Sequence, residues 1–151
     1  MTTIVILESV ILLIGTILHP TDYSEYSKNA LQIACALARD YSARLVVLHV
    51  AIMPFADRYQ TITPEAVLKE AQEQLNHLQL PIDTIRAERR VELGDPVSEI
   101  LRIAKEISAD VIVMGSHGRT GLQRLLTGSV TELVLRTAHC LVLTTTKQSV
   151  I

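Results

Sequence analysis

The residues with the clearest capacity for chemistry lie between positions 115 and 130. Gly115 and Gly118 follow an apolar run, and Gly128 and Ser129 stand where a helical pattern begins. Glycine tolerates positive φ and lets a ligand come close to the backbone. The free N–H groups at a helix start attract phosphate, and the helix dipole adds to that attraction. The segment therefore predicts a phosphate-binding loop, although glycine is also common in strand–helix loops that bind nothing.

Polar side chains in the same segment fit a phosphate ligand. Ser116 and Ser129 carry hydroxyl groups that can hydrogen-bond to phosphate or help to hold a metal ion. Arg119 and Arg124 can balance negative charge. His117 is either a catalytic base or a residue that orders the loop. We favour the second interpretation, because no carboxylate partner stands near it in the sequence.

Patterns typical of other chemistries are missing from the sequence. It has no GK[ST] of a Walker A loop, no GxGxxG and no nucleophile elbow. No residue is an evident candidate to position an attacking water, so we expect slow hydrolysis of a bound phosphate compound at most and assign no catalytic residue. His19 and His49 fall in expected strands and are interpreted as structural. No histidine pair has metal-ligand spacing, so no metal ligands are assigned.

The two cysteines and the charge balance bear on location and partners. Cys35 and Cys140 lack CxxC spacing, which indicates a reducing, cytoplasmic environment rather than a disulfide framework. The net charge is -2 and the pI is about 6.2. Nucleic-acid binding requires a basic face, so we do not expect a nucleic-acid partner.

Alternating strands and helices must position the glycine-rich segment. Helices are expected after the N-caps Ser24, Thr63 and Asp95, and again from Ser129 to Arg136. In the first of them, one apolar stripe is expected to face the core, formed by Ala30, Ile33, Ala34, Leu37, Ala38 and Tyr41. Strands are expected at 16–20, 44–50, 85–93, 110–114 and 141–146. The strand at 85–93 is partly polar, which places it near a sheet edge.

This alternation predicts a single α/β domain with an open five-stranded parallel sheet and helices on both faces, as in Rossmann-like folds. The 151 residues are 48% hydrophobic and only 3% aromatic, so the core must consist mainly of aliphatic side chains. In such sheets ligands bind outside the carboxyl ends of the strands, where the winding reverses. Residues that directly follow strands are therefore the candidate binding residues.

Residues 1–15 form an apolar N-terminal arm of unknown role, and residues 16–147 form the domain. The run from Ile4 to Ile14 is interrupted by Glu8 and is too short for a membrane span, so no membrane partner is expected. It also lacks the basic region and cleavage site of a secretory signal. It could be an extra strand, an arm packed on the surface, or the product of a start codon assigned too far upstream.

The pattern Gly115-x2-Gly118-x9-Gly128-Ser129 resembles the G-2x-G-9x-G-[S/T] signature of the universal stress protein family, in its ATP-binding branch. Four further segments are similar to that family at the expected places: residues 20–24, residues 48–50, residues 94–96 and residues 138–140. The resemblance covers residues 16–146.

The resemblance implies a fold of the adenine nucleotide alpha hydrolase type, with ATP over the ends of the first and fourth strands. ADP or AMP is an alternative ligand, and magnesium is the expected companion ion. Asp22 would contact the adenosine or be merely a turn residue. The remaining implied residues are Val50 at the adenosine, Pro20 and Thr21 in its wall, Met114 and Gly115 at the ribose, and Gly118, Gly128, Ser129 and Val130 at the phosphates, with Ser116, His117 and Arg119 in the same loop.

The resulting hypothesis is an ATP-binding stress-response protein that uses its nucleotide as a signal. The resemblance also implies a homodimer that pairs through the last strand, Leu141 to Thr146; the alternative is an edge covered by the arm at residues 4–14. Two other functions stay open. One is a dimeric scaffold that binds no nucleotide and acts through protein partners, and the other is a genuine ATPase.

Overall fold

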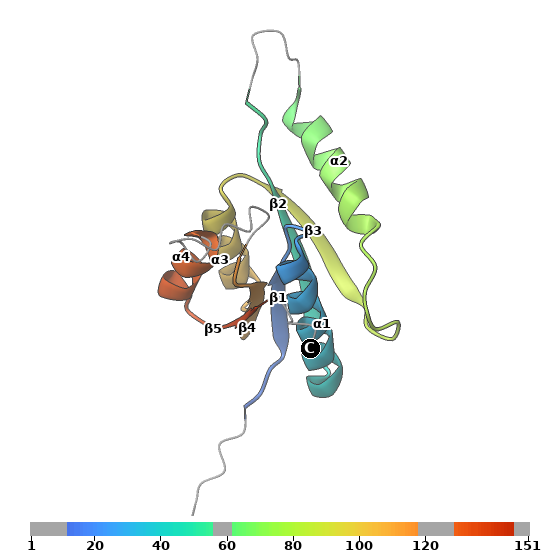
Figure 1. Cartoon of the computed structure of the whole chain (residues 1–151), viewed down its shortest axis with the longest axis vertical. Coiled ribbons are helices and arrows are strands. Elements are labelled where there is room, and N and C mark those ends of the chain that lie inside the picture. Colours follow the sequence, from blue (N-terminus) through green and yellow to red (C-terminus); the bar gives the residue numbers. More distant parts are fainter. Residues whose placement is uncertain (1–11, 56–61, 118–128, 147–151) are drawn as a thin grey trace, which may run out of the picture.

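The computed structural model describes residues 12–55, 62–117 and 129–146. Five parallel strands form one sheet in the order β3-β2-β1-β4-β5, which confirms the expected fold class (Figure 1). β3 lies at a sheet edge, as its polar sequence predicted, and β5 forms the other edge. The strands are β1 (Thr16–Pro20), β2 (Arg44–Ala51), β3 (Ala87–Leu93), β4 (Val111–Gly115) and β5 (Leu141–Thr145).

The helices of the described residues are α1 (Glu25–Tyr41), α2 (Pro64–Asn76), α3 (Pro96–Glu106) and α4 (Ser129–Thr137). The three predicted N-caps are confirmed, because the side chains of Ser24, Thr63 and Asp95 each accept a backbone N–H from the first turn of their helix. None of these helices is long and apolar enough to cross a membrane.

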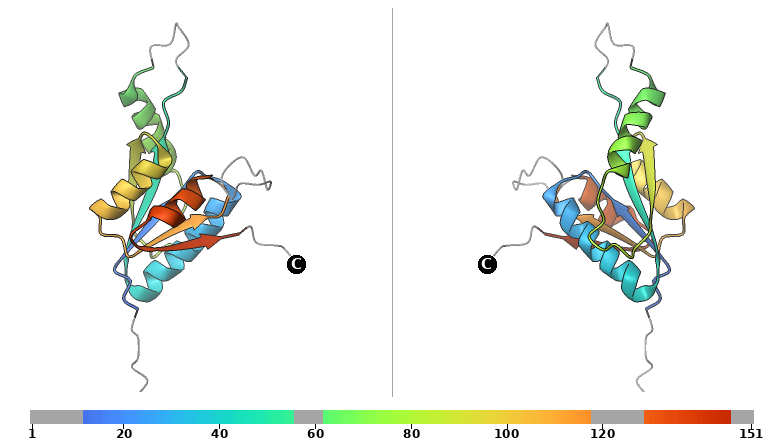
Figure 2. Two further views of the ribbon diagram at one scale, coloured as in Figure 1. Left: turned by 90° about the vertical axis from the view of Figure 1, so that its left-hand side faces the viewer. Right: turned by 90° about the vertical axis from the view of Figure 1, so that its right-hand side faces the viewer.

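Helices cover both faces of the sheet (Figure 2). α1 and α2 pack on one face, where Ala34, Leu75 and Val113 belong to one buried cluster. α3 and α4 pack on the opposite face, where Ile103 and Val134 belong to a second cluster. Each inner strand therefore contributes side chains to two cores, which explains its continuous apolar sequence.

The buried face of α1 matches the predicted stripe only in part. Ala30, Ala34 and Ala38 are buried as expected, and Leu37 packs partly buried against the core. Ile33 and Tyr41 were also expected to face the core, yet they are 38% and 42% exposed. Leu31 and Cys35, which were not in the predicted stripe, are buried with the alanines. Small residues let the helix axis come close to the strands, and the larger apolar side chains then lie at the margins of the contact.

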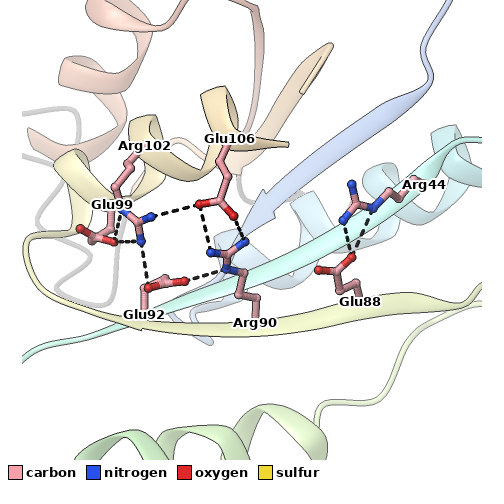
Figure 3. A network of polar contacts seen from close by, with 7 residues as sticks. All are labelled: Arg44, Glu88, Arg90, Glu92, Glu99, Arg102 and Glu106. Carbon is pink, nitrogen blue, oxygen red and sulfur yellow. Dashed lines mark hydrogen bonds and ion pairs between the residues drawn. The ribbon is translucent and has the colours of Figure 1, made fainter. Parts of the chain in front are cut away.

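A charged network joins α3 to β3 in place of an apolar contact (Figure 3). Arg90 of β3 binds Glu92 on its own strand and Glu106 of α3. Arg102 of α3 binds Glu92, Glu99 and Glu106. This arrangement explains the alternate charges of β3, since Arg90 and Glu92 reach α3 and Glu88 pairs with Arg44 of β2.

Candidate nucleotide-binding site

The carboxyl ends of β1 and β4 lie next to each other in the sheet, where the strand order reverses. From β1 the chain adds β2 and β3 on one side, whereas β4 and β5 lie on the other. The paired residues of β1 and β4 end at Leu18 and Ile112, although β1 continues to Pro20 and β4 to Gly115. An open α/β sheet binds ligands at such a point, so this edge is the candidate site.

A fully buried histidine lies at this point. The His19 Nδ1 is 2.8 Å from the Val113 carbonyl oxygen. Burial lowers the pKa of His19 to about 4, although the hydrogen bond to Val113 and the charge of Asp22 act in the opposite direction. The ring is therefore neutral near pH 7, and Nδ1–H donates to the carbonyl. This confirms the structural interpretation of His19.

Thr21 follows β1 and is held by four hydrogen bonds. Its N–H donates to Leu48 O at 2.8 Å, and its carbonyl lies 2.8 Å from the His49 Nδ1. Its Oγ1 accepts from Tyr23 N–H at 3.1 Å and from the Ser27 hydroxyl at 2.8 Å. Because these contacts fix the backbone after β1, Thr21 sets the direction in which the next residue points.

Asp22 is half-buried in a tight turn. Its Oδ1 accepts the Ser24 N–H at 3.0 Å, and Tyr23 has a left-handed φ of 64°. The Tyr23 ring packs on His49 with centroids 4.9 Å apart. The turn role that the sequence left open for Asp22 is thus present. The contact with adenosine stays a prediction. Asp22 lies just after the end of β1, the region in which that contact is expected.

Pro20, Val50 and Met114, the other predicted residues at strand ends, differ in how far their side chains are exposed. Pro20 and Val50 are half-buried at the ends of β1 and β2. Met114 is only 5% exposed, and its side chain belongs to the cluster beneath α3 and α4. Val50 can therefore offer side-chain surface to a ligand, whereas Met114 can offer mainly its backbone.

Gly115 is required by the packing of α1. A Cβ atom at this position would lie 2.8 Å from the Tyr26 backbone carbon and 2.8 Å from the Tyr26 Cβ. Real Cβ contacts are essentially never so close. The sequence favoured Gly115 because a ligand can approach glycine. In the structure, the neighbour that approaches it is the first turn of α1.

Tyr26 also contacts the start of the glycine-rich segment. Its ring lies 5.0 Å from the His117 ring, and the His117 Nδ1 is 2.9 Å from the Ser116 hydroxyl oxygen. The Ser116 N–H donates to Thr145 O of β5 at 2.8 Å. Sequence reasoning missed Tyr26, because an aromatic residue in a first helical turn carries no pattern specific to a binding site.

The first turn of α4 is attached to the end of β4. The Thr131 hydroxyl donates to Gly115 O at 2.8 Å in a buried contact, and Val130 packs on the cluster beneath the helix. The N-terminus of α4, beginning at Ser129, therefore lies beside the carboxyl end of β4. Thr131 was also missed, although a threonine between the apolar residues of a helix stripe is a usable signal.

Part of the predicted site lies outside the described residues. This applies to Gly118, Arg119, Arg124 and Gly128 and to the side chain of Ser129. The structure does bring together the ends of β1, β2 and β4 and the start of α4. Within the described ranges, no group of three or more His, Cys, Asp or Glu side chains is placed to hold a metal ion.

Comparison with known proteins gives consistent matches. The model of the universal stress protein family matches residues 14–145. Universal stress protein MJ0531 of Methanocaldococcus jannaschii is 35% identical over 138 residues, which cover 87% of this chain and 81% of that protein. A family member of known structure from Burkholderia pseudomallei is 32% identical, with a TM-score of 0.68 over 87% of this chain and 95% of its own. A universal stress protein solved in complex with cAMP is 24% identical, with a TM-score of 0.61 over 91% of this chain and all of its own.

Proposed function

Because this chain belongs to the universal stress protein family, we propose that it binds an adenine nucleotide at the ends of β1 and β4 and uses it as a signal. The observation that carries the proposal is the position of the two described ends of the glycine-rich segment. The segment leaves the carboxyl end of β4 and returns at the N-terminus of α4, which Thr131 attaches to Gly115. The returning helix start directs its free N–H groups toward the region where a phosphate would bind.

ATP is the nucleotide that fits this arrangement best. Nine residues separate Gly118 from Gly128, so the loop is long enough to follow several phosphates rather than one. Ser129 and Arg119 supply a hydroxyl and a positive charge in the same segment. Magnesium would accompany the phosphates, bound mainly by their oxygens and by water, as that ion prefers. A universal stress protein of the same fold has been solved in complex with cAMP, which supports an adenine nucleotide as the class of ligand.

The residues after β1 and β2 would hold the adenosine. Asp22 would accept a hydrogen bond from the base or the ribose, and Val50 would pack against the ring. Pro20 and Thr21 would form the adjacent wall, which the four hydrogen bonds of Thr21 keep rigid. Met114 and Gly115 would line the ribose with backbone atoms.

The site is better suited to retention of ATP than to rapid hydrolysis. General-base catalysis needs a group that is within reach of a water and is oriented for its proton. In the described part of the site, His117 directs its Nδ1 at the neighbouring Ser116 hydroxyl and its ring at Tyr26. No described carboxylate is hydrogen-bonded to the His117 ring. If the bound nucleotide is cleaved slowly, the occupancy of the site depends on the concentration of free nucleotide, and the protein can act as a sensor of it.

We also propose that the protein acts as a homodimer through β5. β5 pairs with β4 on one side and is the edge of the sheet on the other. Leu141 and Leu143 lie on one face of this strand and are 55% and 36% exposed. An edge strand with free backbone groups and exposed leucines is a liability in a monomer, and pairing with a second copy removes it. A cytoplasmic location completes the proposal.

The test is to identify any nucleotide that stays bound to the protein through purification. The full chain is purified without added nucleotide and denatured, and the released small molecules are separated and weighed by mass spectrometry. ATP at about one per chain, or ADP or AMP at that ratio, supports the proposal. If neither retained nor added adenine nucleotide binds, the protein is a scaffold that acts through partners. Repeated release of phosphate from added ATP would instead assign an ATPase.

A further inference from the structure

A groove lies on the α3 side of the molecule and runs along α3 to Ala109 and Cys140, which directly precede the region where β4 and β5 begin. It has a volume of about 470 Å³ and runs between α3 and the segment that joins α4 to β5. The nucleotide proposal gives this groove no role. Its apolar lining consists of Leu101, Ala104, Ala109, Ala138 and Cys140.

The N-terminal arm joins the domain beside this groove. The N–H groups of Gly15 and Thr16 donate to the Asp110 Oδ2 at 2.8 and 2.9 Å. Asp110 directly follows Ala109, which lines the groove. The carboxylate therefore fixes the point at which the arm leaves the domain, one residue from the groove lining.

The arm carries apolar surface that the described structure does not cover. Ile14 is buried in the cluster beneath α1 and α2, but Leu12 and Leu13 are 51% and 80% exposed. Residues 4–11 continue this apolar sequence with only Glu8 and Ser9 as polar members. Burial of such side chains is favourable by about 25 cal/mol for each Å² removed from water. Ala109 of the groove lining directly precedes Asp110 at the attachment point, so the apolar groove can receive these side chains.

The arm is long enough to follow the groove. Along α3, the lining runs from Ser98 to Lys105, seven residue steps that rise about 10 Å. An extended chain covers that length with about three residues. Residues 4–11 supply eight, and residues 12–14 remain to connect them to the fixed point at Gly15. Because both partners belong to one chain, their effective concentration is in about the millimolar range.

The charges also agree. Glu8 is the one ionisable side chain among residues 2–14. Lys105 lies at the rim of the groove and makes no ion pair with another described residue. Arg102, the other strong cation in the lining, already binds three glutamates. Lys105 is therefore the natural partner for the single acidic residue of the arm.

We propose that residues 4–11 of the N-terminal arm bind as an extended segment in the groove between α3 and the start of β5 of the same chain, with Glu8 paired to Lys105. The arm then covers the apolar floor of the groove. It leaves the outer edge of β5 open for a second copy, so this proposal and the dimer are compatible. The proposal does not depend on nucleotide binding.

The native Cys140 in the groove provides the test. In the full chain, Cys35→Ala removes the other thiol, and either Ile6→Cys or Leu7→Cys adds one to the arm. Two neighbouring positions are used because successive side chains of an extended segment point to opposite sides. A matched protein carries the same arm cysteine with Cys140→Ala and Leu143→Cys, which moves the second thiol to the exposed face of β5. Disulfide formation under mild oxidation is measured by mass and by gel mobility.

One arm position should form an intramolecular disulfide with Cys140 at least about tenfold faster than the matched pair does with Leu143→Cys, as the effective concentration of a docked segment implies. Faster bonding to the β5 position would mean that the arm covers the sheet edge and would overturn the proposal. Disulfides mainly between chains, or equally slow bonding at both sites, would overturn it as well.

A charge exchange tests the pairing of Glu8. In the background of the faster arm cysteine, Glu8→Lys and Lys105→Glu should each slow the bonding to Cys140 by about threefold, the size expected for an exposed ion pair. The double variant should restore the original rate. If each single change is neutral, or if the double variant is slower than both, the Glu8–Lys105 pairing is wrong.

Discussion

The His19 imidazole of β1 binds the Val113 carbonyl of β4, with 2.8 Å between Nδ1 and the oxygen. The ladder between these strands ends at Leu18 and Ile112. If it continued in register, the Val113 carbonyl would face the nitrogen of Pro20. Proline has no N–H to donate, so the ladder cannot continue. The His19 side chain supplies the missing donor and holds the two strand ends at the point where the proposed nucleotide site opens.

The buried His19 makes the stability depend on pH. Its pKa is about 4 in the folded protein, against 6.5 for an ordinary histidine, because burial disfavours the charged ring. The unfolded chain therefore binds a proton more readily. The stability that the neutral ring provides is complete above pH 6.5 and is lost as the pH falls toward 4. The loss at pH 4 is about 3 kcal/mol.

Urea unfolding between pH 7 and pH 4 checks this prediction. His19→Asn is the matched variant, because its amide nitrogen can occupy the place of Nδ1 and has no titration in this range. The wild-type free energy of unfolding should fall by about 3 kcal/mol more than that of the variant. Equal losses in the two proteins would show that His19 is not the group responsible.

Gly115→Ala should destabilise the fold. The added Cβ would lie 2.8 Å from backbone and side-chain atoms of Tyr26, so α1 must move away from β4. Overpacking of this kind costs about 1–3 kcal/mol, measurable as a lower denaturant midpoint. Gly15→Ala is the control, since its Cβ would meet only the Asp110 carboxylate oxygen at 3.4 Å. Equal stability of Gly115→Ala and wild type would refute this account of Gly115.

Thr131 should act on both stability and nucleotide binding. Thr131→Val keeps the shape but leaves the buried Gly115 carbonyl without the hydroxyl donor, at a cost of about 1–3 kcal/mol. The start of α4 should then be held less firmly, and ATP affinity should fall with it. Thr131→Ser retains the hydroxyl and should preserve most of both properties. If the Thr131→Val protein has wild-type stability and ATP affinity, the role assigned to Thr131 is wrong.

The dimer prediction concerns the exposed edge. Leu141→Lys places a charge on β5 and should weaken dimerisation by at least about tenfold, because charged residues protect sheet edges from pairing. Ile52→Lys is the control, at a comparably exposed apolar residue that follows β2. Sedimentation equilibrium measures both. A monomeric wild type, or a Leu141→Lys protein that remains as dimeric as the control, contradicts the proposed interface.

The fold was largely predictable from the sequence because its signals are local. Ser24, Thr63 and Asp95 cap helices at the expected residues, and the polar strand Ala87–Leu93 lies at the edge. The buried face of α1 was predictable only in part. The apolar stripe alone favours Ile33, whereas the close approach of α1 to β4 selects alanines. That approach depends on Gly115, which is distant in the sequence.

The candidate site was predictable to a different degree. The glycine spacing and the strand ends located it, since both are written in consecutive residues. The contacts that support it were not, because Tyr26, Thr131 and Thr145 reach the glycine-rich segment through tertiary packing. The role of Gly115 shows the limit most clearly: a glycine in a binding motif can be there for a neighbouring helix.

Titration of nucleotide-free protein with ATP and magnesium, followed by isothermal calorimetry, tests the central claim most directly. Wild type should bind one ATP per chain with a Kd in the micromolar range, about −8 kcal/mol. Gly118→Val should weaken binding by at least about 100-fold, because a side chain blocks the close approach of phosphate to the backbone, and should leave the unfolding midpoint unchanged. Absence of ATP binding by the folded wild type, or equal affinity in the Gly118→Val protein, would contradict the account.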